Sequence, residues 1–415
     1  MRSVFLLGIL AISLFVSLGL VGRAPDYWPT DGWREAFPED MGMDSEILEN
    51  MFGWIEEKGH NIEGVVIVRY GYIVEEGYLT DGKVRAVSED YTEEMHDLYS
   101  VTKSVTALLV GIAIDEGYLE LSQTLYDFFP EKWDPSYDSR KKTITIQHLL
   151  TMTSGLEWLE GFEGYSSYFS SSDYIQYTLD LPLTSDPGET FNYNTPASHL
   201  LSAIVEDVTG QKMSEFAQER LFEPLGISEA YLDWDEDPQG ITTGGWGLSL
   251  TPRDMAKIGL LCLNNGTWDG EQIVDSGWIE TATTPNLGGS DYGYLFWLFE
   301  GGYTCAGLYG QHIFVIPEHD LVAAFTANLW METSQVTQIY DHLMENFVVG
   351  AVVHVLLGDL NTDGIVDIFD AVLLSIAFGS SLEDPEWNRS ADLNDDDIID
   401  IFDVVLFAQN FGKTE

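Results

Sequence analysis

A long apolar run from Ser104 to Tyr118 follows residues 100–103, which are Ser-Val-Thr-Lys. The run has helical length and little to interrupt it, so it predicts a buried helix that begins near Ser100. One helical turn separates Ser100 from Lys103, which places both side chains on the same face. A serine hydroxyl needs a base within hydrogen-bond reach, and a lysine whose ammonium is destabilised by burial can be that base. The pattern indicates a nucleophile–base pair.

The Ser-x-x-Lys pattern alone carries little weight because it occurs twice. Residues 139–142 are Ser-Arg-Lys-Lys, in a polar run ahead of residues 143–146, which have the pattern of a strand start. Three adjacent cations are expected to stay hydrated and exposed. We therefore interpret Ser139 as a surface residue and Ser100 as the candidate nucleophile.

Further segments follow Ser100 in a recognisable order. They are residues 148–156 (HLLTMTSGL), 187–195 (PGETFNYNT), 244–256 (GGWGLSLTPRDMA), 292–297 (YGYLFW) and 305–311 (CAGLYGQ). Together they resemble the class C β-lactamase-related serine hydrolases, the penicillin-recognising fold, over residues 44–348. That group includes esterases, D-amino-acid peptidases and 6-aminohexanoate-dimer-type amide hydrolases. The resemblance implies an α/β (α+β) fold, in which an antiparallel sheet is flanked by helices and joined to a helical subdomain.

The resemblance also implies roles for individual residues. Ser100 would be the acyl-accepting nucleophile, Lys103 its base and Tyr193 the proton shuttle to the leaving group. Lys103 is expected to lower the pKa of the Tyr193 phenol toward neutrality. The oxyanion would lie between the backbone N–H groups of Ser100 and Leu308. No cofactor is expected for this chemistry.

Four residues are candidates for the substrate pocket: Trp158, Trp246, Asn194 and Gly307. Aromatic side chains are also common in protein cores, so burial away from substrate is the competing interpretation for the two tryptophans.

Two departures from the family bear on the substrate. The second motif is Tyr193-Asn194-Thr195 where many relatives have Tyr-x-Asn, and the third begins with Cys305 where a lysine or histidine is common. Without a lysine to bind a substrate carboxylate, an ester or neutral amide is favoured. Two alternatives remain: a D,D-peptidase or β-lactamase-like penicillin-binding enzyme, and a non-catalytic binding protein on the same fold.

The charge balance excludes one class of partner. The 415 residues include 18 Lys and Arg against 69 Asp and Glu, for a formal net charge of −51. Nucleic-acid binding is therefore excluded as a function. A surface this acidic suits an extracellular setting or high salt, or is simply well solvated.

The order of segments predicts four parts. Residues 1–24 have the pattern of a signal peptide, with an uncleaved membrane anchor as the alternative, so the protein is expected to be secreted or extracellular. Residues 25–42 form a linker, 43–350 the hydrolase domain and 356–415 a small all-α module of paired calcium loops.

The C-terminal module is predicted from a repeat with an offset of 33 residues. Oxygen donors at loop positions 1, 3, 5 and 12, with a backbone carbonyl at position 7, are typical of calcium loops. The predicted Ca²⁺ ligands are Asp359, Asn361, Asp363, Ile365 and Asp370 in the first loop, and Asp392, Asn394, Asp396, Ile398 and Asp403 in the second. At the turn position, Asp397 in the second loop must adopt a left-handed φ.

This repeat resembles a type I dockerin, which implies a cohesin-like protein partner. It departs from that family in carrying Ile-Phe pairs at residues 368–369 and 401–402, where polar residues often meet the cohesin. The apolar pairs could instead pack within the module.

Overall fold

The computed structural model describes residues 27–80, 83–85, 87–88, 92–286, 291–353, 358–361, 365–381, 384, 387–394 and 396–413. The predicted signal or anchor segment, residues 1–24, lies outside them. Within these residues, no helix has both the length and the apolar character needed to cross a bilayer. The chain divides into two compact units, residues 1–36 with 52–340 and residues 37–51 with 341–415.

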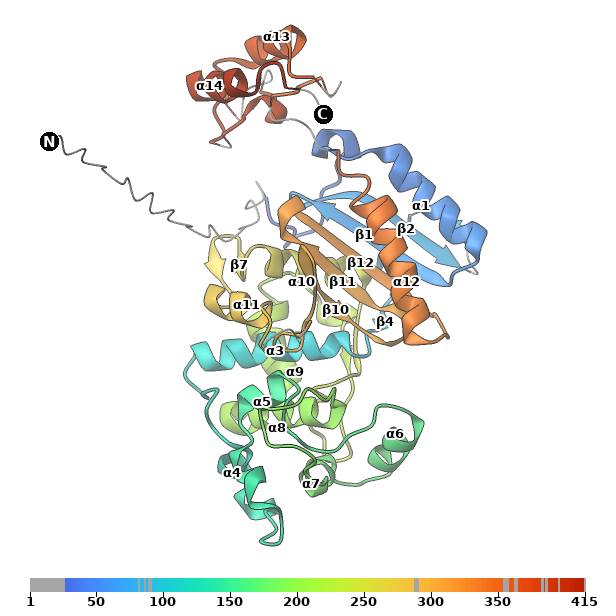
Figure 1. The fold of residues 1–415 in the computed structure, drawn as a ribbon, viewed down its shortest axis with the longest axis vertical. Coiled ribbons are helices and arrows are strands. Elements are labelled where there is room, and N and C mark those ends of the chain that lie inside the picture. Colours follow the sequence, from blue (N-terminus) through green and yellow to red (C-terminus); the bar gives the residue numbers. More distant parts are fainter. Residues whose placement is uncertain are drawn as a thin grey trace, which may run out of the picture. The chain divides into compact units, whose positions relative to one another are not determined.

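A seven-stranded antiparallel sheet forms the frame of the first unit (Figure 1), in the order β3-β2-β1-β12-β11-β10-β9. Its strands are β1 (Ile62–Arg69), β2 (Tyr72–Thr80), β3 (Lys83–Arg85), β9 (Trp297–Phe299), β10 (Gly302–Ala306), β11 (His312–Ile316) and β12 (Leu321–Ala327). Tyr70 and Gly71 join β1 to β2 with φ values of 52° and 85°. Two residues of positive φ make the tight turn that matches the twist of a hairpin.

Helices cover both faces of this sheet, as the family resemblance implied. On one face α10 (Pro252–Leu263) packs so closely that a Cβ on Gly259 would lie 2.4 Å from Val322 and 2.8 Å from Ile313. On the other face Tyr340 of α12 (Thr333–Leu343) contacts the rings of His312 and Phe314. Alternate residues of β11 therefore face opposite helices, as the two-residue period of a strand requires.

The helical part of the first unit is built around α3 (Val101–Asp115). Every residue of α3 from Val101 to Ala113 is buried, which explains the uninterrupted apolar run. Figure 1 shows α3 between the sheet and six further helices. These are α4 (Leu125–Phe128), α5 (Ile146–Leu150), α6 (Phe162–Phe169), α7 (Tyr174–Asp180), α8 (Thr195–Thr209) and α9 (Met213–Ala217). Another helix, α11 (Ser276–Ala282), lies on the same side of α3 as the sheet.

Short strands complete this unit. A three-stranded sheet has the order β4-β6-β5, and β7 pairs with β8 in a small hairpin. Their bounds are β4 (His96–Asp97), β5 (Asp233–Trp234), β6 (Leu248–Leu250), β7 (Thr267–Trp268) and β8 (Glu271–Gln272). β4 ends three residues before Ser100, so the nucleophile candidate lies between a strand and the buried helix α3.

The structure contradicts two predictions made for the second Ser-x-x-Lys pattern, at residues 139–142, and the segment that follows it. Residues 143–146 do not begin a strand: Thr145 caps α5 instead, accepting a 3.3 Å hydrogen bond from the backbone N–H of His148. Lys141 is buried and donates to the carbonyl of Leu179 at 2.7 Å, so the prediction that these cations stay exposed was wrong for that residue. A buried ammonium is tolerated where it donates to a fixed carbonyl. Ser139 itself is exposed.

The described residues of the second unit include α13 (Ile368–Ala377) and α14 (Ile401–Asn410), which begin in the same way. Asp367 and Asp370 form a capping box at the start of α13, and Asp400 and Asp403 repeat it at α14. A small apolar core lies between the helices, formed by Val366, Leu374, Ala377, Ala391, Ile399 and Phe407.

Candidate active site

The predicted nucleophile and base are in direct contact. Lys103 Nζ donates a 2.8 Å hydrogen bond to Ser100 Oγ and a 2.7 Å hydrogen bond to the carbonyl oxygen of Gly245. Ser100 precedes the first turn of α3, and Lys103 lies within that turn. Tyr99, with φ of 46°, adopts a left-handed conformation that is uncommon for residues other than glycine. The turn that presents Ser100 is therefore strained, as is frequent at functional sites.

Burial sets the charge of Lys103. The side chain is 1% exposed, and this desolvation lowers its pKa to about 7, although the nearby Glu160 carboxylate opposes the shift. An ordinary lysine, with a pKa near 10.4, would be almost entirely protonated at neutral pH. Lys103 is available as a neutral amine near pH 7, which is what a general base requires.

Tyr193 completes the group but not in the charge state that the sequence suggested. Its phenol is hydrogen-bonded with Ser100, and its ring centroid lies 5.0 Å from Lys103 Nζ. Burial raises the pKa of the Tyr193 phenol above its ordinary value. The expectation that Lys103 would lower this pKa was wrong, because desolvation disfavours the phenolate and also leaves Lys103 a weakly charged neighbour. Tyr193 is thus a protonated phenol that can donate its proton.

The backbone around Leu308 suits an oxyanion site. Gly307 donates its N–H to Gln311 O at 2.7 Å, which closes a tight turn around residues 308–310. A Cβ on Gly307 would lie 2.3 Å from the carbonyl of Leu98, two residues before Ser100. Glycine therefore lets the Leu308 turn approach the segment that carries the nucleophile.

The Asn194 side chain is bonded to backbone at the start of α8. It is 1% exposed, and its Oδ1 accepts a 2.9 Å hydrogen bond from Ala197 N as the N-cap of α8. Its Nδ2 donates to the carbonyl of Leu156. The amide is occupied in holding the backbone, so a contact between Asn194 and substrate stays a prediction. An asparagine two residues before Pro196 is a helix-start pattern, and the sequence could have been interpreted that way.

The two predicted pocket tryptophans belong to an aromatic cluster. Trp158 is 7% exposed and its Nε1 donates to Glu160 at 2.6 Å. Trp246 follows Gly245 in the chain and contacts Tyr168 and His199. Trp158 therefore acts mainly within the cluster, whereas Trp246 lies next to the carbonyl that accepts from Lys103.

Three residues of the site were not singled out from the sequence. Gly245 supplies a carbonyl to Lys103, Glu160 lies close enough to act on Lys103 electrostatically, and Trp297 stacks on Tyr193 with ring centroids 5.7 Å apart. Gly245 and Trp297 lie in segments that carry the family resemblance. The local sequence gives only a weak signal that Glu160 belongs to the site, because it is an acidic residue in an aromatic-rich stretch.

Cys305 brings no charge to the site. It is 1% exposed, and burial raises the pKa of its thiol to about 12, although a hydrogen bond with Ser104 opposes the shift. Cys305 is therefore a neutral thiol at the position where many relatives carry a cation. Both Cys262 and Cys305 are buried and free, as small core residues.

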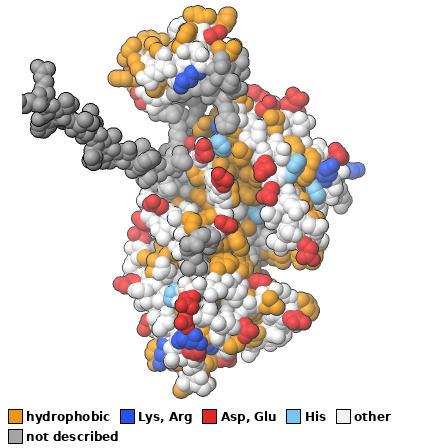
Figure 2. All heavy atoms as spheres, in the orientation of Figure 1, with side chains coloured by type: hydrophobic (Ala, Val, Ile, Leu, Met, Phe, Trp, Pro, Cys, Tyr) orange, Lys and Arg blue, Asp and Glu red, His pale blue; other side chains and the backbone are white. Residues whose placement is uncertain are grey.

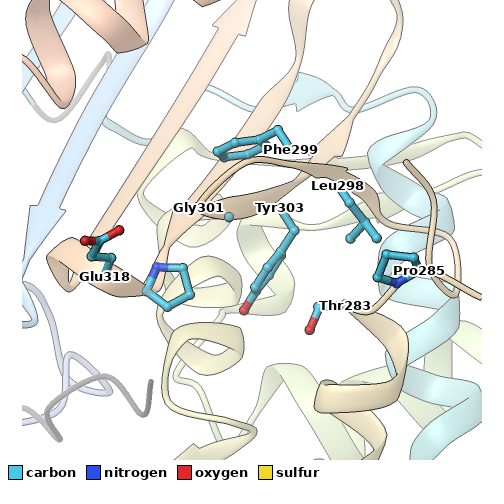
Figure 3. A pocket seen from close by; sticks show the side chains of 9 residues that line it. Thr283, Pro285, Leu298, Phe299, Gly301, Tyr303 and Glu318 are labelled. Carbon is cyan, nitrogen blue, oxygen red and sulfur yellow. The ribbon is translucent and has the colours of Figure 1, made fainter. Parts of the chain in front are cut away.

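A pocket of about 370 Å³ lies elsewhere on this unit, along β9 and β10 (Figure 3). Figure 3 shows the Tyr303 and Leu298 side chains on its wall and Glu318 at one end. The lining residues are Thr283, Pro285, Leu298, Phe299, Gly301, Gly302, Tyr303, Pro317 and Glu318. None of them belongs to the group around Ser100, so this pocket is separate from the candidate active site.

Comparison with known proteins agrees with this geometry. The Beta-lactamase family model matches residues 54–342. The chain is 27% identical over 264 residues to a 6-aminohexanoate-dimer hydrolase of Paenarthrobacter ureafaciens, covering 55% of this chain and 65% of that protein. It is 31% identical over 211 residues to the esterase EstB of Burkholderia gladioli, covering 47% and 53%. The chain thus spans less than two thirds of either relative's length.

Solved structures show the same fold. The octameric penicillin-binding protein homologue from Pyrococcus abyssi superposes with a TM-score of 0.56 at 22% identity, covering 73% of this chain and 77% of that one. EstCE1, a hydrolase with promiscuous acyltransferase activity, gives a TM-score of 0.58 at 17% identity, covering 73% and 98%. Fold and site together define the β-lactamase and transpeptidase-like serine hydrolase fold. The chain belongs to the Beta-lactamase family.

Proposed function

We propose that this protein is a serine hydrolase that cleaves an ester or neutral amide through an acyl-enzyme on Ser100. The observation that carries this proposal is the 2.8 Å contact between Ser100 Oγ and Lys103 Nζ, an amine whose pKa burial lowers to about 7. A non-catalytic protein would gain nothing from holding an amine unprotonated beside a hydroxyl, since burying it costs stability.

The chemistry follows from these positions. Neutral Lys103 takes the proton of Ser100 as Oγ bonds to the substrate carbonyl carbon. The carbonyl oxygen becomes an oxyanion that accepts from the backbone N–H groups of Ser100 and Leu308, each contributing about 3 kcal/mol by the usual effect of removal. Tyr193 donates its proton to the leaving group and regains one from Lys103. Water then releases the acid by the same steps in reverse.

The surroundings favour a substrate without a carboxylate. Cys305 is a neutral thiol, and Glu160 places negative charge near Lys103. An anionic group next to the scissile bond would be repelled there. By their printed names, the two relatives act as a 6-aminohexanoate-dimer hydrolase and an esterase. This supports esters and neutral amides over a D,D-peptidase or β-lactamase substrate.

A substrate panel tests the proposal. Purified protein is assayed with p-nitrophenyl esters, D-amino-acid amides and nitrocefin, beside the Ser100→Ala variant. We expect turnover of esters or amides that Ser100→Ala abolishes. Rapid nitrocefin hydrolysis would favour the penicillin-binding alternative, and no turnover or acylation of any compound would favour a binding protein.

For the second unit we propose two calcium sites. Asp370 is fully buried, and its carboxylate accepts the N–H groups of Leu360, Asn361 and Asp367 at 2.7–3.0 Å. Asp403 repeats this arrangement in the second loop, where it is also fully buried. Backbone amide donors stabilise a buried carboxylate but do not neutralise its charge. A hard cation that binds oxygen ligands, such as Ca²⁺, would neutralise it. Asp397 adopts the expected left-handed φ, at 65°.

The ligand set is incomplete among the described residues, because Asp363 lies outside them. Within the described part of the chain, no three His, Cys, Asp or Glu side chains converge as a metal site. Calcium loops also use asparagine and backbone oxygens, here Asn361, Asn394 and the carbonyls of Ile365 and Ile398. The ten predicted ligands therefore remain the proposal.

The exposed apolar side chains of this unit support a protein partner of the cohesin type. Ile368 and Phe369 are 61% and 65% exposed, and Ile401 and Phe402 are 57% and 62% exposed. Figure 2 shows hydrophobic side chains gathered on the surface of this unit. These pairs do not pack within the module, which was the competing expectation. Contiguous exposed apolar side chains are typical of interaction surfaces. We propose that the protein is exported, by the N-terminal segment, to a setting where such assembly occurs.

A further inference from the structure

The carboxylate of Glu160 is held by three donors in the wall of the candidate active site. Trp158 Nε1 donates to Oε1 at 2.6 Å and the backbone N–H of Thr195 donates to the same oxygen at 3.1 Å. The Tyr165 hydroxyl donates to Oε2. A carboxylate with this many fixed donors cannot swing out to bind a substrate without losing several charge-assisted hydrogen bonds.

These contacts connect Glu160 to the proton shuttle. Thr195 begins α8 two residues after Tyr193, and its Oγ1 lies 3.0 Å from the Tyr165 hydroxyl oxygen, to which it donates because the single phenolic proton goes to Glu160. The segment that presents the Tyr193 phenol is therefore attached to Glu160 through both its backbone and a side chain. A loop fixed in this way keeps the phenol near Ser100.

Glu160 also acts on the charge of the site. Its carboxylate raises the pKa of Lys103, against the larger effect of burial, and it raises that of Tyr193 in the same direction as burial. The other titratable groups around the pair, Tyr165, Tyr292 and Cys305, have pKa values raised by burial and are neutral near pH 7. Glu160 is thus the anionic side chain that acts on Lys103 among the described residues.

We propose that Glu160 is a positioning residue for acyl transfer, which holds the Tyr193 segment and supplies the fixed negative charge that balances Lys103 when Lys103 takes the proton of Ser100. This inference rests on the proposed function. The ammonium forms in a desolvated site, where it is costly unless an opposite charge lies nearby. Glu160 makes Lys103 a stronger base and keeps Tyr193 protonated until the leaving group departs.

Glu160→Gln tests this because it removes the charge and keeps the shape. The readout is kcat/KM against pH with a p-nitrophenyl ester, whose acid limb reports the protonation of Lys103 in the free enzyme. We expect the limb of Glu160→Gln to move to lower pH by about 1 unit, with a lower plateau because the base is weaker. The rate of fluorophosphonate labelling against pH gives the same limb without turnover.

Glu163→Gln is the matched control. Glu163 is exposed and lies three residues after Glu160, in the first turn of α6. The substitution Glu163→Gln removes the same charge from the same segment of the chain. Its limb should stay where it is in the unaltered protein, because exposed charges are screened by salt.

The outcomes separate this inference from the proposed function. A folded Glu160→Gln protein with an unmoved limb overturns the role of Glu160, and so does an equal shift in Glu163→Gln. If circular dichroism shows that Glu160→Gln does not fold, Glu160→Asp is used instead. The shorter aspartate keeps the charge but moves the carboxylate away from the site by the length of one methylene group. If the acid limb of Glu160→Asp moves by a smaller amount in the same direction, the proposal is supported. If the limb does not move, the proposal is overturned. An unaltered protein with neither turnover nor labelling overturns the proposed function instead.

Discussion

The carbonyl oxygen of Gly245 accepts a 2.7 Å hydrogen bond from Lys103 Nζ, although 142 residues separate the two in the chain. This contact aims the amine at Ser100 Oγ and gives it an acceptor when it is protonated. A carbonyl is a dipole without net charge, so it orients Lys103 without fully offsetting its desolvation. The pKa of Lys103 therefore stays lowered, at about 7, and the amine still has a fixed direction.

Ser100→Ala should abolish covalent labelling by a fluorophosphonate probe, because the probe bonds to the activated serine oxygen. Labelling is measured by intact-protein mass. Ser139→Ala is the control and should label like the unaltered protein, since Ser139 is exposed at the start of a short 3₁₀ turn and is not hydrogen-bonded to Lys103. Equal labelling of Ser100→Ala would remove Ser100 as the nucleophile.

Tyr193→Phe should lower kcat by about 10²–10⁴-fold with little change in KM, because it removes a proton donor and keeps the ring. The ring should still stack on Trp297, so the melting temperature should change little. Amide substrates should suffer more than p-nitrophenyl esters, since an amine leaves only when protonated. Near-normal kcat on an amide would mean that the proton reaches the leaving group by another path.

His312→Phe should reduce the acid sensitivity of the fold. His312 stacks on Phe314 with centroids 4.9 Å apart, and burial lowers its pKa to about 3. Between about pH 6.5 and 3 the unfolded chain binds a proton at this residue that the folded chain does not, so stability falls as pH falls. The variant should lose about 1–2 kcal/mol less than the unaltered protein between pH 7 and pH 5.

Urea unfolding at the two pH values measures this difference. His342→Phe, in the last turn of α12, is the comparison for the effect of replacing a histidine with phenylalanine. If His312→Phe and the unaltered protein lose stability equally, His312 is protonated in the folded state.

Asp370→Ala should remove one of two calcium-binding events in the full chain. It deletes a buried carboxylate that accepts three backbone N–H groups, so the first loop loses both a ligand and its closure. Isothermal titration counts the sites, and Asp403→Ala should remove the other one. No heat of calcium binding in the unaltered protein would mean that the repeat folds without metal.

The local sequence was enough to predict several elements. The buried helix that begins near Ser100 and the left-handed φ of Asp397 both depend on residues within a few positions of each other in the chain. The family resemblance implied an antiparallel sheet but not the order of its strands, since pairing between β1 and β12 joins segments some 250 residues apart. Nothing local in either strand specifies that partner.

The sequence by itself determined which groups could carry the chemistry: a serine and lysine one turn apart at the start of a buried helix, and a tyrosine in a family motif. Only the tertiary structure decided their charge states. Burial by distant segments lowers the pKa of Lys103 and raises that of Tyr193, while the Glu160 carboxylate opposes the shift at Lys103 and adds to the shift at Tyr193. The Gly245 carbonyl orients the lysine. Protonation depends on the whole surroundings of a group, which sequence spacing does not contain. The hydrogen bonds of Asn194 were likewise decided by the tertiary structure, because its amide donates to the carbonyl of Leu156, 38 residues earlier in the chain.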